Sequence, residues 1–372
     1  MNSAVSSYLK KRSIKGPWNL EPVPKYTFKY ALVVPVYNEL GYIDTLIDSI
    51  KRQDEKILRT TAVVFVVNNS LSDNDIIKSN NQRTIELISS LKEDLFFVID
   101  ASTSGKEIAE EFAGVGFARK LGADLIVNHM SIDSILLYTD ADVLLDKNYL
   151  KFIDEYYLEN TNSMAAVVGF RHQKSSDSHI NQIIEEYERY LYDTAHRINK
   201  SGSPYGYVSI GSCITCRYKA YLAVGGMNKK KATEDFYFLN ELAKFNNVDT
   251  IKEILVYPSS RSENRIYLGT GFHINNILSG GKIEDIYFSD IGYSKLESLI
   301  QIIFNSFTLP IDDINKNLMN LDQGYEFLIK NNVIYIIEEL QRTSKSANQF
   351  INQFNRWFDA LKTIKFIKLF KV

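Results

Sequence analysis

Four apolar runs in the first half of the chain each end in polar side chains, and this alternation constrains the fold more than any other feature. The runs are YALVV over Tyr30–Val34, which ends at Pro35, TAVVFVVNN from Thr61, LFFVIDAS from Leu95 and LLYTDADV from Leu136. β-branched and aromatic residues favour buried strands. Segments with helical spacing separate the runs, over 41–52, 75–92 and 105–124. This order predicts an α/β fold with a mainly parallel sheet and helices on both faces.

The rest of the chain is less regular. Residues 1–27 are polar and indicate an N-terminal arm, and 28–278 form the predicted sheet domain. Within that domain, 179–200 have helical spacing, 208–216 (VSIGSCITC) are typical of a strand, and a helix begins near Glu234. From about 279 to 372 the periodicity is mostly helical, which predicts a helical C-terminal extension.

Each predicted strand ends in side chains that bind ligands well. They are Asn38–Glu39, Asn68–Asn69, Asp100 and the pair Asp140 and Asp142. In parallel sheets of this kind, ligands bind outside the carboxyl ends of the strands. Side chains at i and i+2 of a strand share a face, so the two aspartates repel each other unless a cation or hydrogen-bond donors compensate.

Composition narrows the class of protein. The 372 residues are 45% apolar and 24% charged, as in ordinary globular proteins, and a net charge of −2 argues against bulk electrostatic capture of nucleic acid. Cys213 and Cys216 have neither a second cysteine pair nor a histidine pair nearby, which favours buried thiols over a zinc or redox site. We therefore expect a reducing, cytoplasmic setting, with neither a signal peptide nor a membrane-spanning segment.

Five fragments together resemble one family. VVPVYNE, VVNNSLSDN, GVGFARKLGAD, YTDADV and VGGMNKKKATEDFYFLNEL occur in the order found in inverting family 2 glycosyltransferases of the GT-A (Rossmann-like) fold. The resemblance covers about residues 28–275. It implies transfer of a sugar from a UDP- or GDP-linked donor to a hydroxyl on a glycan or lipid-linked acceptor. Bacterial surface-polysaccharide or glycolipid assembly is the setting that this family suggests.

The resemblance also implies roles for the acids. Asp140 and Asp142 match the family's Asp-x-Asp motif, in which the first aspartate contacts the sugar nucleotide and the second reaches Mg²⁺ or Mn²⁺, so both are candidate metal-site residues. In TED, Asp235 matches the base that takes the acceptor proton, and Glu234 is a supporting acid. Acids in a first helical turn are also ordinary capping residues, which is the competing interpretation.

By the same resemblance, Pro35, Tyr37 and Glu39 form one wall of the nucleoside site, and Asn68 or Asn69 meets the base. Many relatives have an acidic pair where this chain has two asparagines, so the nucleotide identity stays open.

Two further donor-site candidates have an alternative each. Asp100 either contacts the base or caps the loop that follows it. Arg119 either lies near the donor, as in the family, or forms a salt bridge on a helix surface.

The segment YPSSRSENRIYLGTGFH adds cations. Arg261 and Arg265 match phosphate oxygens bidentately and are expected to close over the diphosphate. His273 is a candidate third metal ligand, although a lone histidine more often has no metal.

The C-terminal segment LKTIKFIKLFKV places lysines three residues apart, at 362, 365, 368 and 371. This spacing fits a basic amphipathic helix that contacts a membrane surface or a partner, or a tail helix packed on its own domain.

Two other functions of the protein stay open as well. A sugar-nucleotide nucleotidyltransferase would carry a glycine-rich basic loop where this chain has PVYNEL, and an inactive nucleotide-sugar-binding module would bind without turnover.

Overall fold

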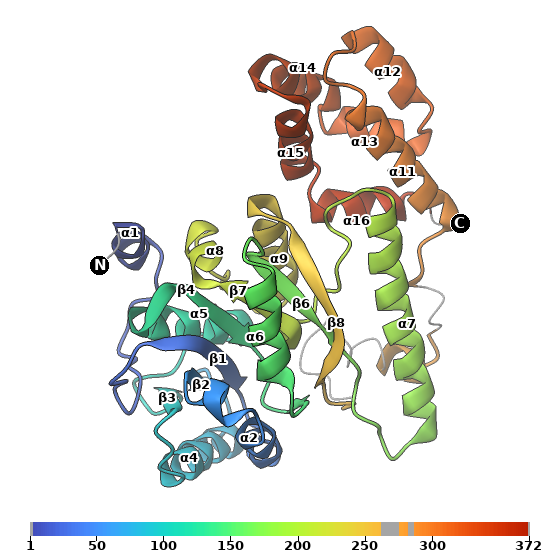
Figure 1. Cartoon of the computed structure of the whole chain (residues 1–372). Coiled ribbons are helices and arrows are strands. Elements are labelled where there is room, and N and C mark those ends of the chain that lie inside the picture. Colours follow the sequence, from blue (N-terminus) through green and yellow to red (C-terminus); the bar gives the residue numbers. More distant parts are fainter. Residues whose placement is uncertain (1–2, 262–274, 282–285, 371–372) are drawn as a thin grey trace. The chain divides into compact units, whose positions relative to one another are not determined.

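The structure is a computed structural model that describes residues 3–261, 275–281 and 286–370 (Figure 1). The chain divides into two compact units. The first comprises Met1–Ile184 and Ser209–Asn275, and the second comprises Glu185–Val208 and Asn276–Val372.

The first unit contains a mixed sheet. Within the described residues it has eight strands in the order β3-β2-β1-β4-β7-β6-β8-β5. Four neighbouring pairs are parallel (β1 with β2 and β4, β2 with β3, β6 with β8), and β7 and β5 run antiparallel to their neighbours. The predicted α/β class, with a mainly parallel sheet, is confirmed. The strands are β1 (Phe28–Val36), β2 (Thr61–Asn68), β3 (Phe96–Ala101), β4 (Met130–Tyr138), β5 (Leu144–Leu145), β6 (Ala165–Phe170), β7 (Ile214–Arg217) and β8 (Val248–Tyr257).

Helices cover this sheet. The helix α5 packs against β1 and β2, α4 against β2 and β3, α6 against β8, and α8 against β4. The helices of the first unit are α1 (Ser3–Lys11), α2 (Ile43–Lys51), α3 (Glu55–Leu58), α4 (Asp75–Ser90), α5 (Val115–Ile126), α6 (Tyr149–Glu159), α8 (Tyr218–Ala223) and α9 (Glu234–Phe245). The long helix α7 (Ser178–Lys200) contributes its residues from Glu185 onward to the second unit.

The first strand continues past the predicted stop at Pro35. β1 extends to Val36, and Pro35 lies opposite Val66 of β2. Proline is normally excluded from central strands because it lacks a backbone donor. The last β1–β4 pair is Val33 with Tyr138, so Pro35 lies beyond the ladder on that side. The proline is therefore tolerated.

Two other predicted elements are shorter than expected. The helix predicted over 105–124 begins only at Val115, because Ile108 instead bridges to Ser70 and donates its backbone N–H to the carbonyl of Asn69, 3.0 Å away. The strand predicted over 208–216 is limited to Ile214–Arg217, and a 3-10 turn occupies Gly211–Cys213.

The N-terminal arm is anchored to α5 by one buried carboxylate. Asp124 accepts hydrogen bonds from the Tyr8 hydroxyl at 2.6 Å, the Ile14 backbone N–H at 2.7 Å and the Tyr221 hydroxyl at 2.7 Å. The Lys120 ammonium lies 3.2 Å from the same carboxylate. Burial lowers the pKa of Lys120, and Asp124 opposes that shift. This anchor was not predicted, since nothing in the polar arm marks Tyr8 as buried.

The second unit has an apolar core of its own. Phe350, Phe354, Phe358 and Phe366 are buried in it together with aliphatic side chains. Its helices are the end of α7 together with α11 (Asp290–Phe304), α12 (Ile311–Met319), α13 (Gln323–Lys330), α14 (Val333–Thr343), α15 (Ala347–Trp357) and α16 (Ala360–Lys368). The predicted helical extension is confirmed.

The C-terminal lysines lie on α16, whose apolar side is covered. Phe366 and Ile367 are buried in the core of the second unit, while Lys365 and Lys368 are exposed. The helix packs on its own domain, as one interpretation expected, and contact of its lysines with a membrane surface or a partner stays a prediction; Lys371 lies outside the described residues. Across the part of the chain that the structure describes, no helix is both long and apolar enough to span a membrane.

We predict that Asp124→Ala destabilises the first unit by about 3–5 kcal/mol, because it leaves the buried Lys120 without its anion. The measurement is urea unfolding in a Trp357→Phe background, where the fluorescence of Trp18 reports the first unit. Asp133→Ala is the control, since Asp133 is 71% exposed and its pairing with Lys219 spans 3.5 Å; we expect a change within about 0.5 kcal/mol. Equal effects of the two variants would contradict the role of Asp124 as an anchor.

Candidate active site

The short pairing of β5 with β8 brings two distant segments together. Leu144 lies opposite Tyr257, so the turn that contains Asp142 meets the segment that follows β8. The Gln173 side chain donates from Nε2 to the backbone carbonyls of Asp142 at 2.9 Å and of Tyr257 at 2.8 Å. Asp142 and Arg261, 119 residues apart in sequence, therefore face each other on a fixed backbone.

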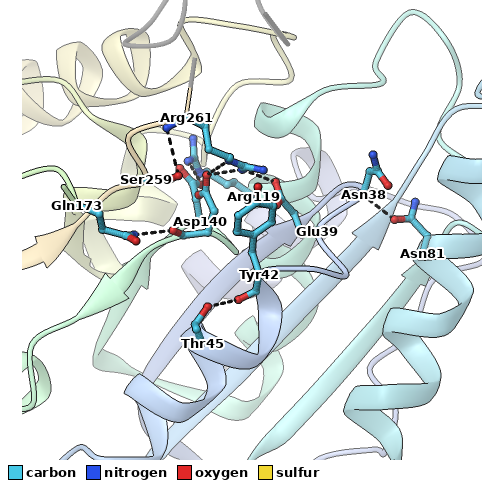
Figure 2. A network of polar contacts seen from close by, with 11 residues as sticks. Asn38, Glu39, Tyr42, Thr45, Asn81, Arg119, Asp140, Gln173, Ser259 and Arg261 are labelled. Atoms are coloured by element: carbon cyan, nitrogen blue, oxygen red, sulfur yellow. Dashed lines mark hydrogen bonds and ion pairs between the residues drawn. The ribbon is translucent and has the colours of Figure 1, made fainter. Parts of the chain in front are cut away.

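Arg261 holds two carboxylates at once. Its Nε donates to Asp142 Oδ2 at 3.1 Å, its Nη2 contacts the same oxygen, and Nη2 also reaches Glu39 Oε1 at 3.0 Å. The guanidinium carbon lies 4.1 Å from the centre of the Tyr42 ring, a cation–π contact. Figure 2 shows Arg261 beside Glu39 and Tyr42, with Asp140 and Arg119 close by. Arg261, which follows β8, thus contacts one acid that follows β1 and one that follows β4.

Arg119 joins the Asp-x-Asp turn to the start of α9. Its Nη2 contacts Asp140 Oδ1 and its Nη1 contacts Glu234 Oε1. Arg119 is 3% exposed, so it is not the helix-surface salt bridge that was one of its two interpretations. Its Nε is buried and has no hydrogen-bond partner among the described residues. One guanidinium thus links the two predicted acid motifs.

Glycines make room for this link. A Cβ on Gly211 would lie 2.2 Å from Arg119 Nη1, and a Cβ on Gly116 would lie 2.4 Å from the Lys230 carbonyl oxygen and 2.8 Å from Glu234 Cβ. A Cβ on Gly122 would lie 2.5 Å from Val33. The helix α5 can therefore approach β1 and the start of α9 closely enough for Arg119 to reach both acids.

Glu234 and Asp235 begin α9, as the sequence predicted. Thr233, just before them, has a φ of +61°, which is rare for a β-branched residue. Asp235 accepts a hydrogen bond from the Phe236 backbone N–H at 2.7 Å, and Asn228 donates to the Glu234 carbonyl at 3.1 Å. From this strained turn Glu234 contacts Arg119, while the Asp235 carboxylate lies against its own backbone.

Burial changes the proton affinity of the acids. It raises the pKa of Glu234 to about 7, against the opposing charge of Arg119. Burial also raises the pKa of Asp235 and of Asp140, and Arg119 again opposes both shifts. For Arg119 itself, burial would lower the pKa, but Asp140 and Glu234 outweigh it and raise the pKa. The cluster therefore retains protons more readily than isolated carboxyl groups do.

The asparagines at the end of β2 face inward. Asn68 Nδ2 donates to the carbonyls of Val36 and Val66, at 3.1 and 3.2 Å. Asn69 Oδ1 accepts from Asn81 Nδ2 at 3.0 Å, and both Asn68 and Asn69 are buried. Their predicted contact with a base stays a prediction, and in this structure their amides join β1, β2 and α4.

The remaining nucleoside candidates lie at the same edge. Pro35 is buried within β1, and the Tyr37 hydroxyl donates to Asp73 Oδ1 at 2.7 Å. Asp100 caps the loop that follows β3, one of its two predicted roles, by accepting from the backbone N–H groups of Ser102 and Thr103 at 3.1 and 2.9 Å. Burial would raise the pKa of Asp100, but these hydrogen bonds, those of Thr103 first, lower it.

Not all predicted residues can be placed. Arg265 and His273 lie outside the described residues. Among the residues that are described, no group of three or more His, Cys, Asp or Glu side chains has a metal-binding arrangement. Asp140 and Asp142 offer carboxylate oxygens at a strand end, a donor set that suits Mg²⁺ or Mn²⁺ shared with phosphate oxygens. Cys213 and Cys216 are free thiols, and their predicted burial is confirmed.

Sequence reasoning missed several residues of the site. Tyr42 supports Arg261, Gln173 fixes the Asp142 backbone, and Gly211 clears the space for Arg119. The glycine in SIGSC was the one available signal, since an isolated glycine in a strand-like run often marks close backbone approach.

We predict that protonation of Glu234 stabilises the native protein at low pH. Its pKa rises from 4.5 to about 7 on folding, so this contribution is complete below pH 4.5 and is lost as the pH rises through about 7. The free energy of unfolding of the wild type, minus that of Glu234→Gln, should therefore fall by on the order of 2 kcal/mol between pH 4.5 and 7.5. Urea titrations of both proteins measure the difference. Parallel pH curves would show that Glu234 is ionised throughout.

Comparisons with known proteins find similar structures at low identity. Residues 1–349 of TarS from S. aureus match with 14% identity over 88% of this chain and 91% of that chain, with a TM-score of 0.45. The TarS 1–349 complex with UDP-GlcNAc has the same identity and coverage and a TM-score of 0.46. The mannosyltransferase PcManGT from Pyrobaculum calidifontis, in complex with GDP-Man and Mn²⁺, has 17% identity over 95% and 94% of the chains and a TM-score of 0.41. No protein-family description matches the sequence, and neither does any curated protein.

Proposed function

We propose that this protein is a metal-dependent, inverting glycosyltransferase of the GT-A type. It moves one sugar from a nucleotide-sugar donor to a hydroxyl of a glycan or lipid-linked acceptor. The observation that carries the proposal is the Arg119 bridge between Asp140 and Glu234. An acid that binds the donor and an acid pair that performs catalysis must face the same reaction centre. Because Arg119 contacts Asp140 and Glu234 at once, the Asp-x-Asp motif and the Glu-Asp motif lie on either side of a single guanidinium.

The acids then have separate tasks. Asp235 takes the proton of the acceptor hydroxyl while the hydroxyl oxygen bonds to the anomeric carbon. The bond from that carbon to the diphosphate oxygen breaks in the same displacement, and the nucleoside diphosphate leaves with the electron pair. The raised pKa of Asp235 makes it a stronger base than a solvated aspartate. Glu234 positions Arg119 and the acceptor, and Asp140 contacts the sugar nucleotide.

A divalent cation is expected on Asp142, with Asp140 as a second carboxylate, where it would neutralise the leaving diphosphate. Arg261 adds a positive charge beside the same position, and Glu39, Tyr37 and Pro35 form the wall next to it. The residues fit such a cation because Asp140 and Asp142 both offer carboxylate oxygens at one strand end, the donors that Mg²⁺ and Mn²⁺ prefer.

We predict that Asp235→Asn lowers turnover by about 10²–10⁴-fold, the usual contribution of a general base, while donor affinity changes little. Release of UDP or GDP from a panel of nucleotide sugars measures turnover, and calorimetry measures donor binding. Glu241→Gln, on the exposed side of the same helix and paired with Lys244, is the control and should retain activity. Donor binding without turnover in the wild type would favour the inactive binding module, and full activity of Asp235→Asn would refute the base assignment.

We also predict that EDTA abolishes transfer, that added Mn²⁺ or Mg²⁺ restores it, and that Asp142→Ala abolishes it irreversibly. The reason is that a carboxylate oxygen of Asp142 is needed to hold the cation. The measurement is the same release assay, with EDTA-treated and metal-repleted protein compared side by side. Full activity of Asp142→Ala would exclude the metal role of this residue.

A further inference from the structure

The contacts of Arg261 indicate that its guanidinium occupies the place of the expected cation. Two of its nitrogens converge on a single oxygen, Asp142 Oδ2. A divalent cation on Asp142 would need carboxylate oxygens of this same group. The Arg261 guanidinium and a divalent cation are both positively charged, so they would also repel each other if both contacted Asp142.

Arg261 is held in this position by more than one group. Glu39 accepts from the same Nη2, and the Tyr42 ring lies beneath the guanidinium. The side chains of Arg261, Glu39 and Asp142 are 16%, 8% and 18% exposed, so water screens the contacts only partly. An arginine side chain is charged at any ordinary pH, so these contacts are ion pairs.

From these contacts we propose that Arg261 and the divalent cation compete for Asp142, and that the donor diphosphate resolves the competition. This inference rests on the proposed function, since it takes the donor to be a nucleoside diphosphate sugar. In the donor-free protein the guanidinium neutralises Asp142 and Glu39. When the diphosphate binds, its oxygens offer Arg261 a bidentate partner and the cation takes Asp142.

Competition of this kind has a thermodynamic consequence. The cation alone must displace Arg261 from Asp142, so it binds weakly. The diphosphate draws Arg261 away from Asp142, so cation and nucleotide strengthen each other's binding by the same factor. The site then binds the cation and the nucleotide together more tightly than it binds either one alone.

The test is the affinity for Mn²⁺ without nucleotide, measured from the electron paramagnetic resonance signal of free Mn²⁺. We expect Arg261→Gln to bind Mn²⁺ about tenfold more tightly than the wild type, within the usual range of coupling between sites. Arg59→Gln is the matched control, because Arg59 pairs only with Glu55 among the described residues and is 74% exposed; its affinity should equal that of the wild type. Unchanged or weaker binding by Arg261→Gln overturns the proposal.

A second variant covers the case in which Arg261→Gln does not fold. Tyr42→Ala removes the ring beneath the guanidinium and leaves both carboxylates in place, so it should also tighten Mn²⁺ binding, by a smaller factor. The same titration with saturating UDP or GDP, corrected for Mn²⁺ held by the nucleotide alone, should raise the wild-type affinity about tenfold and that of Arg261→Gln much less. Equal gains in the two proteins overturn the proposal.

The readouts separate this inference from the proposed function. If the Mn²⁺ shifts occur but no nucleotide sugar is turned over, the competition stands and the glycosyltransferase assignment fails. If turnover occurs but neither protein binds Mn²⁺ with or without nucleotide, the transfer stands and the competition is wrong.

Discussion

The buried guanidinium of Arg119 is the constraint on which the candidate site depends. A charge that is 3% exposed is stable in the interior only with close polar partners, and here they are the carboxyl groups of Asp140 and Glu234. These acids come from the turn after β4 and from the start of α9, which are far apart in the sequence. Satisfying one cation therefore fixes the relative positions of both motifs. The glycines of α5 and Gly211 matter because they let this cation reach its partners.

The first half of the fold could be predicted from sequence because its strands are buried and regular. β1, β2 and β3 are nearly continuous apolar runs and β4 is one from Ile135 onward, and the residues singled out for ligand binding lie at or just beyond their ends. The sheet strands β5, β6 and β8 escaped prediction. β5 has two residues, and β8 mixes exposed and buried positions without regular alternation and shifts register against β6, so neither has a clear local signal.

The candidate site was predictable in its acids and less so in its cations. Asp140, Asp142, Glu234 and Asp235 stand in motifs whose spacing is local. The partners of Arg119 and Arg261 depend on the packing of α5 and on the β5–β8 pairing, which one sequence does not reveal. Thus Arg261 was expected to face phosphate, and in the structure it faces Glu39 and Asp142.

The length of β5 has a consequence for motion. The Asp142 turn is joined to the end of β8 by two residues of pairing, the Gln173 side chain, one backbone hydrogen bond from Asp146 to Leu255 and the Asp142–Arg261 ion pair. Such a short ladder belongs to the part of a structure that opens locally at low free energy, while the interior strands β1, β2 and β4 open only with the whole unit. Local opening of this sheet edge would separate the Asp142 turn from Arg261, and the contacts of Arg119 with Asp140 and Glu234 would remain. The Asp142–Arg261 end of the candidate site can therefore fluctuate independently of the Arg119 end.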